Sequence, residues 1–394
     1  MTEHEARAAA TALAEAVRGL RALAVRLDPP ARVAVAAGPR AGLLAALAER
    51  LGVPLAVGPA VPDGENGVFE RIIGERLGPA LGRSELDGLP AGPAGITGIT
   101  EIADRVAAAS FDRFRTALDA VAPDGARLPV YTAGDPAAPA VLIASACGMP
   151  AELCSRWLEL LGGEYRIVTW ETRGLFTDEP HFDTLGWDTG AQAGDVFAVM
   201  DHLGIRTAHL LGFCGGSVVA LAAARRSPER IDSLSLWHGA YELGPDSPKL
   251  DHHRNIQALM AMAAEDRDAA AAVHAVFLGT MLGGTPPDLA HLVLYPFATS
   301  ELFYRYCRLN GAITDIDVNP LLAGVDHPTL VVTSEDDTTA NPLGSAEVAR
   351  RLPNATLSVE PTGDHISLFK LGGRLGELAL GFLREHPGGQ AAPR

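Results

Sequence analysis

Short apolar runs alternate with helix-like amphipathic stretches over the middle of the chain. Short apolar runs with the length of buried strands lie at 128–132, 140–145, 165–170, 208–211 and 231–237. Helix-like stretches at 195–203 and 217–226 lie on either side of the fourth run. Two more apolar runs, 329–332 and 356–359, follow closer to the C-terminus. An alternation of strands and helices predicts an α/β fold with a mostly parallel sheet.

Residues 242–322 interrupt this alternation. Their apolar positions have helical spacing over four stretches: 254–264, 269–282, 287–294 and 301–310. The pattern predicts a helical insertion that divides the α/β core into two parts, 126–241 and 323–386. The Gly- and Pro-containing residues 387–394 are expected to form a loose tail.

Residues 1–125 form a separate N-terminal extension with α/β or purely helical character. Apolar side chains recur at helical spacing at Leu13, Val17, Leu20, Ala24 and Leu27, and Pro29-Pro30 ends this helix. Strand-like runs at 32–37 and 54–57 flank a helix-like stretch at 41–51, and 102–121 is again helical. No catalytic motif lies in this part, which favours a scaffold or docking element. The alternative is that it covers an active site or contacts a carrier protein.

Composition narrows the class of protein. Of the 394 residues 47% are hydrophobic, which is ample for a large core, and the formal net charge of −16 argues against nucleic acid or an anionic membrane as partner. No apolar run is long enough to span a bilayer, and the acidic N-terminus lacks a signal-peptide pattern, so we expect a cytoplasmic protein. Four cysteines show neither metal-site spacing nor a disulfide framework. Neither a metal nor another cofactor is predicted.

The most informative segment is Gly212-Phe213-Cys214-Gly215-Gly216. It follows an apolar strand-like run and precedes a helix-like stretch, which is the arrangement of a nucleophile elbow with cysteine as the nucleophile. Glycines two positions before and after Cys214 let the strand and the helix approach closely. The start of the helix favours the thiolate form of the cysteine.

Two later segments supply the partners that a cysteine nucleophile needs. The apolar run 329–332 leads into acidic residues that include Asp336 and Asp337, and the run 356–359 precedes His365. With nucleophile, acid and histidine in this order, residues 127–386 resemble the α/β-hydrolase superfamily. The superfamily pattern has a proline a few residues after the acid, so the resemblance, with Pro342 here, favours Asp337 over Asp336 as the acid. The resemblance implies that the helical insertion 242–322 is a lid, and that Cys214, Asp337 and His365 are the catalytic residues.

The resemblance also implies where an oxyanion would be bound. One donor is the backbone N–H of Gly215, and by position the other is that of Met149, in the loop after the run 140–145. Where superfamily members carry His-Gly-x, this chain has Cys147-Gly148-Met149. Cys147 is expected near the site as a small packing residue. The candidate substrate-pocket residues are Phe213, Cys147, His238 and Tyr241.

A cysteine nucleophile favours thioester chemistry. Exchange of an acyl group from a carrier-protein or coenzyme A thioester onto Cys214 is nearly isoenergetic, and a thioester also acidifies the α-carbon of the acyl group. By size and by the Cys/Asp/His set, the chain looks most like the thioesterase-like Dieckmann cyclases that release tetramic acids or pyridones from polyketide–peptide pathways. That resemblance implies an acyl or peptidyl carrier protein as partner. The alternatives are a simple thioesterase or ester hydrolase like the dienelactone hydrolases, a polyester synthase-like acyltransferase, and a hydrolase-like receptor without activity.

Overall fold

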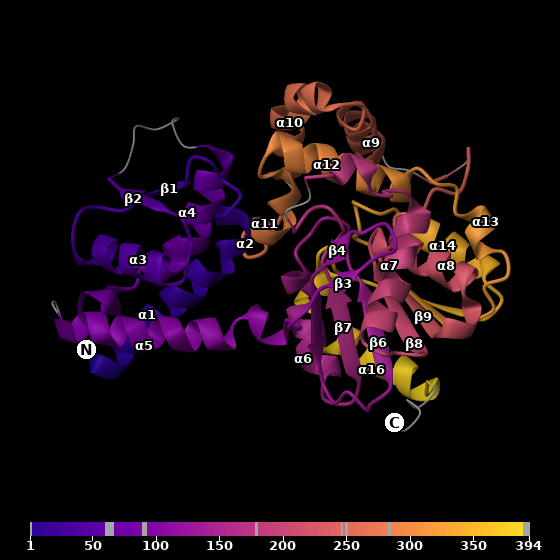
Figure 1. Ribbon diagram of the computed structural model, residues 1–394, viewed down its shortest axis with the longest axis horizontal. Helices are drawn as coiled ribbons and strands as arrows, with labels where there is room; N and C mark the ends of the chain where they lie inside the picture. The colour runs from indigo at the N-terminus through magenta and orange to yellow at the C-terminus, as the bar shows by residue number, and fades with distance from the viewer. Residues whose placement is uncertain are drawn as a thin grey trace. The chain divides into compact units, whose positions relative to one another are not determined.

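The computed structural model describes residues 2–59, 67–88, 93–177, 180–245, 247–248, 251–282 and 285–388. The chain divides into two compact units (Figure 1). The first combines Met1–Arg113 with Leu278–Thr299, and the second combines Phe114–Phe277 with Ser300–Arg394. The segment 278–299 was expected in the lid, but it packs with the N-terminal residues instead. The predicted tail lies almost wholly outside the described residues.

The second unit is built on a seven-stranded sheet with the strand order β11-β10-β9-β8-β6-β7-β5. Its strands are β5 (Val130–Ala133), β6 (Ala140–Ala144), β7 (Arg166–Trp170), β8 (Ala208–Phe213), β9 (Ile231–Trp237), β10 (Thr329–Ser334) and β11 (Ala355–Glu360). Only the β5–β7 pairing is antiparallel, and every other pairing in this sheet is parallel. The predicted α/β-hydrolase fold, with its mostly parallel sheet, is confirmed.

The burial of the strands explains why their sequences are continuously apolar. Every residue of β6, β8 and β10 is buried, as expected for parallel strands that helices cover on both faces. The helices of this unit are α6 (Ser155–Leu161), α7 (Thr189–His202), α8 (Gly216–Arg226), α9 (Asp251–Ala263), α10 (Arg267–Leu282), α12 (Ser300–Thr314), α13 (Asn319–Leu322), α14 (Pro342–Arg351), α15 (Ser367–Lys370) and α16 (Gly373–Glu385). The last residues of α10 belong to the first unit.

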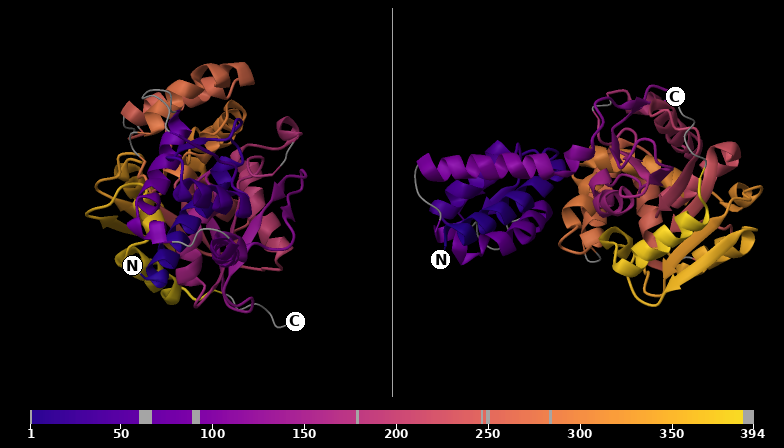
Figure 2. Two further views of the ribbon diagram at one scale, coloured as in Figure 1. Left: turned by 90° about the vertical axis from the view of Figure 1, so that its left-hand side faces the viewer. Right: turned by 90° about the horizontal axis from the view of Figure 1, so that it is seen from below.

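The first unit packs helices around a small parallel sheet. Its elements are α1 (Glu3–Gly19), α2 (Arg21–Ala24), β1 (Arg32–Ala34), α3 (Pro39–Arg50), β2 (Ala56–Gly58), α4 (Val68–Leu81), α5 (Pro93–Ala109) and α11 (Ala290–Val293). Thr2 caps α1 in a capping box with Glu5, and Leu13 and Val17 are among the buried residues of this helix. Helices α1 and α5 lie side by side, as Figure 2 shows from two further directions. The predicted strand–helix–strand segment is present, with β1 parallel to β2.

The sequence-predicted helix 102–121 ends earlier than expected. Helix α5 stops at Ala109, and residues Ala120–Val121 form the strand β3, which pairs antiparallel with β4 (Arg127–Leu128). The turn between them contains Gly125 at a φ of 92°, a conformation that glycine adopts without strain. Pairing across this turn outweighs the local helical pattern. None of the described helices has the length and apolar character needed to cross a membrane.

The close approach of β6 to α8 can be tested with a single methyl group. A Cβ on Gly216 would lie 2.0 Å from the carbonyl oxygen of Ala144, which is backbone and cannot swing away. We expect Gly216→Ala to lower the free energy of unfolding by about 3 kcal/mol or more. Thermal and urea unfolding followed by circular dichroism measure the change.

Gly381→Ala is the matched control, because a Cβ there meets no atom within 4 Å and Gly381 lies inside helix α16. This variant should be as stable as the wild type or more stable by up to about 1 kcal/mol. Equal stabilities for the two alanine variants would contradict the packing described here.

Candidate active site

Cys214 lies on a sharp turn between β8 and α8. Its φ of 53° is left-handed, which is unusual for a residue other than glycine. A Cβ on Gly212 would lie 2.5 Å from the Cα of Ser217, so the strand and the helix meet too closely for a side chain there. The N–H of Cys214 donates to the carbonyl of Trp237 on the neighbouring strand at 2.9 Å. This is the geometry of a nucleophile elbow, and it accounts for the glycine pattern around Cys214.

The loops after β10 and β11 bring Asp337 and His365 together. The Nδ1 of His365 lies 3.0 Å from the Oδ2 of Asp337, and both side chains are buried. The second imidazole nitrogen is then left for Cys214, which lies close enough to raise the pKa of His365. Asp336, the alternative acid, is exposed to solvent. The structure therefore brings Asp337 to His365 and leaves its acidic neighbour at the surface.

Hydrogen bonds keep the buried carboxylate of Asp337 charged. Burial would raise the pKa of Asp337, but hydrogen bonds from His238 and His365 outweigh it and hold the pKa well below its usual value. The other oxygen, Oδ1, accepts the N–H groups of Thr339 at 2.9 Å and Ala340 at 2.8 Å. A carboxylate can only accept hydrogen bonds, so the Nδ1 atoms of both histidines carry hydrogens.

The same contacts favour a protonated His365. Burial would lower the pKa of His365, but the charge interaction with Cys214 and the hydrogen bond to Asp337 raise it well above its usual value. The arrangement therefore favours an imidazolium next to the Asp337 carboxylate. With the Cys214 sulfur beside it, such an imidazolium can give a proton to a group that the sulfur attacks.

The two predicted oxyanion donors differ in their surroundings. No hydrogen bond among the described residues uses the N–H of Gly215. The N–H of Met149 donates to the carbonyl of Ala146 within its own loop, at 3.2 Å. Next to it, the N–H of Gly148 donates to the Thr172 hydroxyl at 2.9 Å. The N–H of Gly215 is thus available to donate to a ligand oxygen, whereas that of Met149 would have to give up a weak internal bond.

The predicted pocket residues have different positions. Phe213 is a core residue, fully buried with its ring centroid 4.9 Å from that of Trp157. Cys147 is also buried, and its sulfur lies 4.0 Å from the amide oxygen of Gln192. Tyr241 is buried, and burial raises the pKa of its hydroxyl; a negative charge on the nearby Cys214 would raise it further.

His238 lies in the core of the site. Its Nδ1 is 2.8 Å from Oδ2 of Asp337, a contact that the sequence did not predict.

Residues of α12, in the predicted helical insertion, also reach the elbow, and sequence reasoning did not single them out for this. A Cβ on Gly215 would lie 3.4 Å from Ile313 and 3.5 Å from the Asn310 amide oxygen, both in α12. A Cβ on Gly148 would lie 2.6 Å from the ring of Tyr306 in the same helix. The predicted helix 301–310 contains Tyr306 and Asn310, but α12 continues to Thr314 and so includes Ile313, and nothing in the sequence indicated which face of the helix meets the elbow.

Among the described residues, one group has the ligand types and spacing to hold a metal ion, namely His238, Asp337 and His365. In the structure the Nδ1 atoms of both histidines already donate to Oδ2 of Asp337, and Cys214 lies close to His365. An ion bound here would displace the hydrogens on the histidine Nδ1 atoms that bind Asp337. The contacts therefore fit proton transfer better than metal binding.

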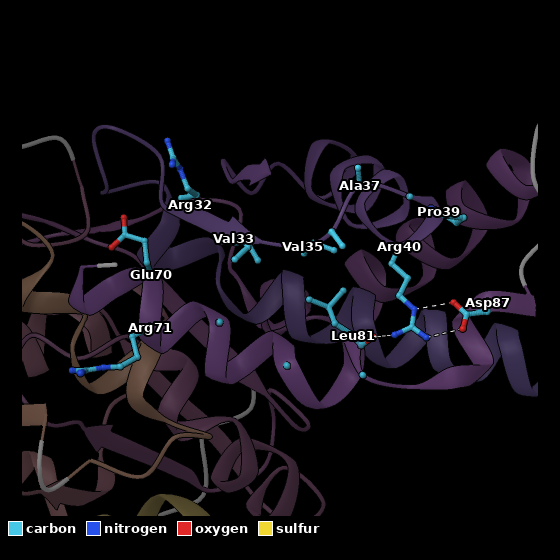
Figure 3. Close-up of a pocket in the computed structure, with 16 residues that line it drawn as sticks. Arg32, Val33, Val35, Ala37, Pro39, Arg40, Glu70, Arg71, Leu81 and Asp87 are labelled. Carbon is cyan, nitrogen blue, oxygen red and sulfur yellow. Dashed lines mark hydrogen bonds and ion pairs between the residues drawn. The ribbon is translucent and has the colours of Figure 1, made fainter. Parts of the chain in front are cut away.

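A separate hollow of about 840 Å³ lies in the first unit, lined mainly by the residues of β1, the following loop and α4 (Figure 3). Arg40 in this hollow is held by Asp87 through two hydrogen bonds, at 2.9 Å and 2.8 Å. None of the described residues that line it is a cysteine, serine or histidine, so these residues offer no such nucleophile for acyl chemistry. The candidate active site therefore lies at Cys214 in the second unit.

Comparisons with known proteins agree with the fold. No protein-family model matches the chain. The proposed carbamate hydrolase RutD of Caulobacter sp. (strain K31) is 27% identical over 245 residues, which cover 57% of this chain and 83% of that protein. The L-allo-isoleucyltransferase of Pseudomonas savastanoi pv. glycinea is 26% identical over 162 residues, which cover 41% of this chain and 57% of the transferase.

Solved structures show the same architecture. The enol-lactonase from Burkholderia xenovorans LB400 superimposes with a TM-score of 0.53 at 20% sequence identity, over 68% of this chain and 99% of the lactonase. The chain therefore has the α/β-hydrolase fold, and its sequence is similar to that of a proposed hydrolase and of a transferase.

The environments of the four cysteines predict selective chemical labelling. Cys214 is partly exposed, whereas Cys147, Cys154 and Cys307 are buried, and burial raises the pKa of each of these three, to about 12 for Cys154. Because the thiolate is the reactive form, limiting iodoacetamide at neutral pH should modify Cys214 and spare the others. Peptide mass mapping identifies the labelled residue. The Cys214→Ala variant should stay unlabelled, and rapid labelling of Cys147 would contradict the described burial.

Proposed function

We propose that the protein is a cysteine-dependent acyl-transfer hydrolase that captures the acyl group of an ester or thioester on Cys214 and releases it to water. The observation that carries this proposal is the Asp337–His365 hydrogen bond next to Cys214, which lies on a turn with the geometry of a nucleophile elbow. The α/β-hydrolase fold and the hydrolytic relatives support it.

In the first half of the reaction, the Cys214 thiolate attacks the acyl carbon. The carbonyl oxygen becomes an oxyanion, which the N–H of Gly215 would stabilise, with Met149 as the second donor predicted from the sequence. When the intermediate collapses, the bond to the leaving oxygen or sulfur breaks and His365 gives that atom its proton. The product of this half is a thioester of Cys214.

In the second half, His365 is neutral and can act as a base. It removes a proton from a water molecule, whose oxygen attacks the thioester carbon. The bond to the Cys214 sulfur then breaks, and the free acid leaves. Asp337 keeps its charge throughout, holding the imidazole in one orientation and stabilising its protonated form.

A second candidate is transfer of the acyl group to another thiol instead of water. The L-allo-isoleucyltransferase among the relatives favours it, because its name describes transfer of an aminoacyl group. A thioester on Cys214 suits such transfer, since exchange between thioesters is nearly isoenergetic. An acyl or peptidyl carrier protein would then serve as donor and as acceptor.

Cyclising release, inferred above from the resemblance to Dieckmann cyclases, is a third fate of the same acyl-enzyme. It needs the same Cys214 thioester, with a carbon of the acyl chain as the attacking group. The relatives named above are hydrolases and a transferase, so they favour the hydrolytic alternative over cyclisation.

One assay separates these fates. The protein is incubated with acyl and aminoacyl N-acetylcysteamine thioesters, including a β-ketoamide, with and without coenzyme A as a thiol acceptor. We expect an intact-protein mass increase by one acyl group on the wild type and free acid as the main product. Acyl-coenzyme A as the main product would favour transfer, and a product lighter than the free acid by one water would favour cyclisation.

The control for this assay is Cys214→Ala, which removes the nucleophile and leaves the fold intact. This variant should form neither the adduct nor the product. Free acid produced by Cys214→Ala at the wild-type rate would rule out the proposed covalent mechanism.

The assignment of the acid can be tested with two neighbouring residues. Asp337→Asn should lower kcat/KM by about a thousandfold or more, because the amide cannot hold His365 in the required tautomer. Asp336→Asn changes an exposed side chain next to it and should leave kcat/KM within about twofold of the wild type. Steady-state thioester turnover measures both variants, and a reversed order would place the acid at Asp336.

A further inference from the structure

Two adjacent strands of the sheet end in the same unusual backbone conformation. Phe213 of β8 pairs with Trp237 of β9, and the residues that follow them, Cys214 and His238, have φ values of 53° and 50°. The N–H of His238 donates to the carbonyl of Val332 on the next strand at 2.8 Å. Left-handed conformations cost free energy in residues other than glycine and are concentrated at functional sites. The turn that presents the nucleophile therefore has a counterpart one strand away.

The turn at His238 directs the imidazole into the candidate active site. The side chain is 1% exposed, and its ring lies perpendicular to that of His365 with the centroids 5.9 Å apart. Its Nδ1 donates to Oδ2 of Asp337 at 2.8 Å, the oxygen that also accepts from His365 at 3.0 Å. Two imidazoles from different strands thus share one carboxylate oxygen.

The shared oxygen limits how Asp337 can move. Because Oδ1 is taken by the backbone N–H groups of Thr339 and Ala340, rotation of the carboxylate would break bonds on both oxygens. Without His238, Oδ2 would accept only the His365 hydrogen bond, and a small rotation of the carboxylate would then change the position of the imidazole. With His238 as a second donor, Oδ2 is fixed between the two rings.

We propose that His238 is a positioning residue, which fixes the Asp337 carboxylate through its Nδ1–H so that His365 is held in line with Cys214. This rests on the proposed function, since it assigns a partner within the same series of residues. His238 needs no contact with the substrate for this role, and its effect on the reaction passes through Asp337.

The chain contains a histidine that serves as a structural comparison. His209 lies on β8, is fully buried, and has its Nδ1 2.7 Å from the hydroxyl of Ser233 on β9. Its Nδ1 thus binds a neighbouring serine, while its Nε2 is buried without a hydrogen-bond partner among the described residues. His238 instead binds the carboxylate that supports the candidate catalytic histidine.

Three substitutions at position 238 separate a specific hydrogen bond from general packing. His238→Asn keeps an N–H donor near the Nδ1 position, and asparagine tolerates a left-handed backbone. His238→Gln places its donor near the Nε2 position instead, and His238→Phe keeps a ring without any donor. His209→Asn is the control for loss of a buried imidazole away from the site.

The first readout is the rate of Cys214 alkylation by iodoacetamide together with the rate of acylation by a thioester. We expect His238→Phe and His238→Gln to slow acylation by about tenfold to a hundredfold with KM little changed, the size expected for a lost hydrogen bond to a charged group. His238→Asn should recover most of this loss. His209→Asn should lower thermal stability and leave both rates within about twofold.

The second readout is the proton NMR spectrum far downfield, where imidazole N–H protons bonded to a carboxylate resonate. The wild type should show two such signals, and His238→Phe should show one. The proposal is overturned if His238→Phe acylates at the wild-type rate, or if His238→Asn is as slow as His238→Phe while both are folded.

Alkylation keeps this test separate from the proposed function. It needs no acyl substrate, so it reports on the link between His238 and Cys214 even if no thioester is turned over. A wild type that is alkylated rapidly but never acylated would refute the acyl-transfer function. Unchanged alkylation and acylation in all three position-238 variants would refute the role of His238 alone.

Discussion

The buried charge of Asp337 is the constraint on which the candidate active site depends. An ionised carboxylate inside a protein is costly unless hydrogen bonds replace its water, and Asp337 receives them on both oxygens. Two of the donors are imidazoles from the loops after β9 and β11, and two are backbone N–H groups of its own loop. Satisfying this one charge therefore ties three consecutive strand ends together and fixes the histidine that contacts Cys214.

The nucleophile side of the site depends on close backbone contact. Gly212 and Gly216 let α8 start directly against β8 and β6, and the N–H of Cys214 is held by the carbonyl of Trp237. The strand that holds the nucleophile turn therefore also carries His238 at its end. Displacement of β9 would disturb Cys214 and Asp337 together, which links the packing of the core to the chemistry at its edge.

Much of this arrangement could be predicted from the sequence, because it depends on local pattern. The apolar runs indicated the strands, and the glycines around Cys214 indicated the elbow. The order of Cys214, Asp337 and His365 then indicated how parallel strand ends would bring them together.

What could not be predicted depends on contacts between distant segments. His238 was expected to line a pocket. Nothing in the sequence around it indicates that its ring contacts Asp337, as it does in the structure. The position of 278–299 in the first unit, and the end of α5 at Ala109, also follow from tertiary packing and not from local spacing.

The residues that choose between water, a thiol and an internal carbon as acceptor belong to a different part of the molecule. The Cys214, His365 and Asp337 arrangement serves all three fates equally, because each begins from the same thioester and each needs the same proton acceptor. The choice is made by what can approach that thioester. Helix α12 places the apolar side chain of Ile313 and the amide of Asn310 against Gly215, whose N–H is the predicted oxyanion donor. An apolar group there hinders water, and an amide there can bind a polar group of the acyl chain or of the acceptor. Under the proposed function, selectivity among acceptors would therefore reside in α12, while the four strand ends would supply a reactive centre common to all of them.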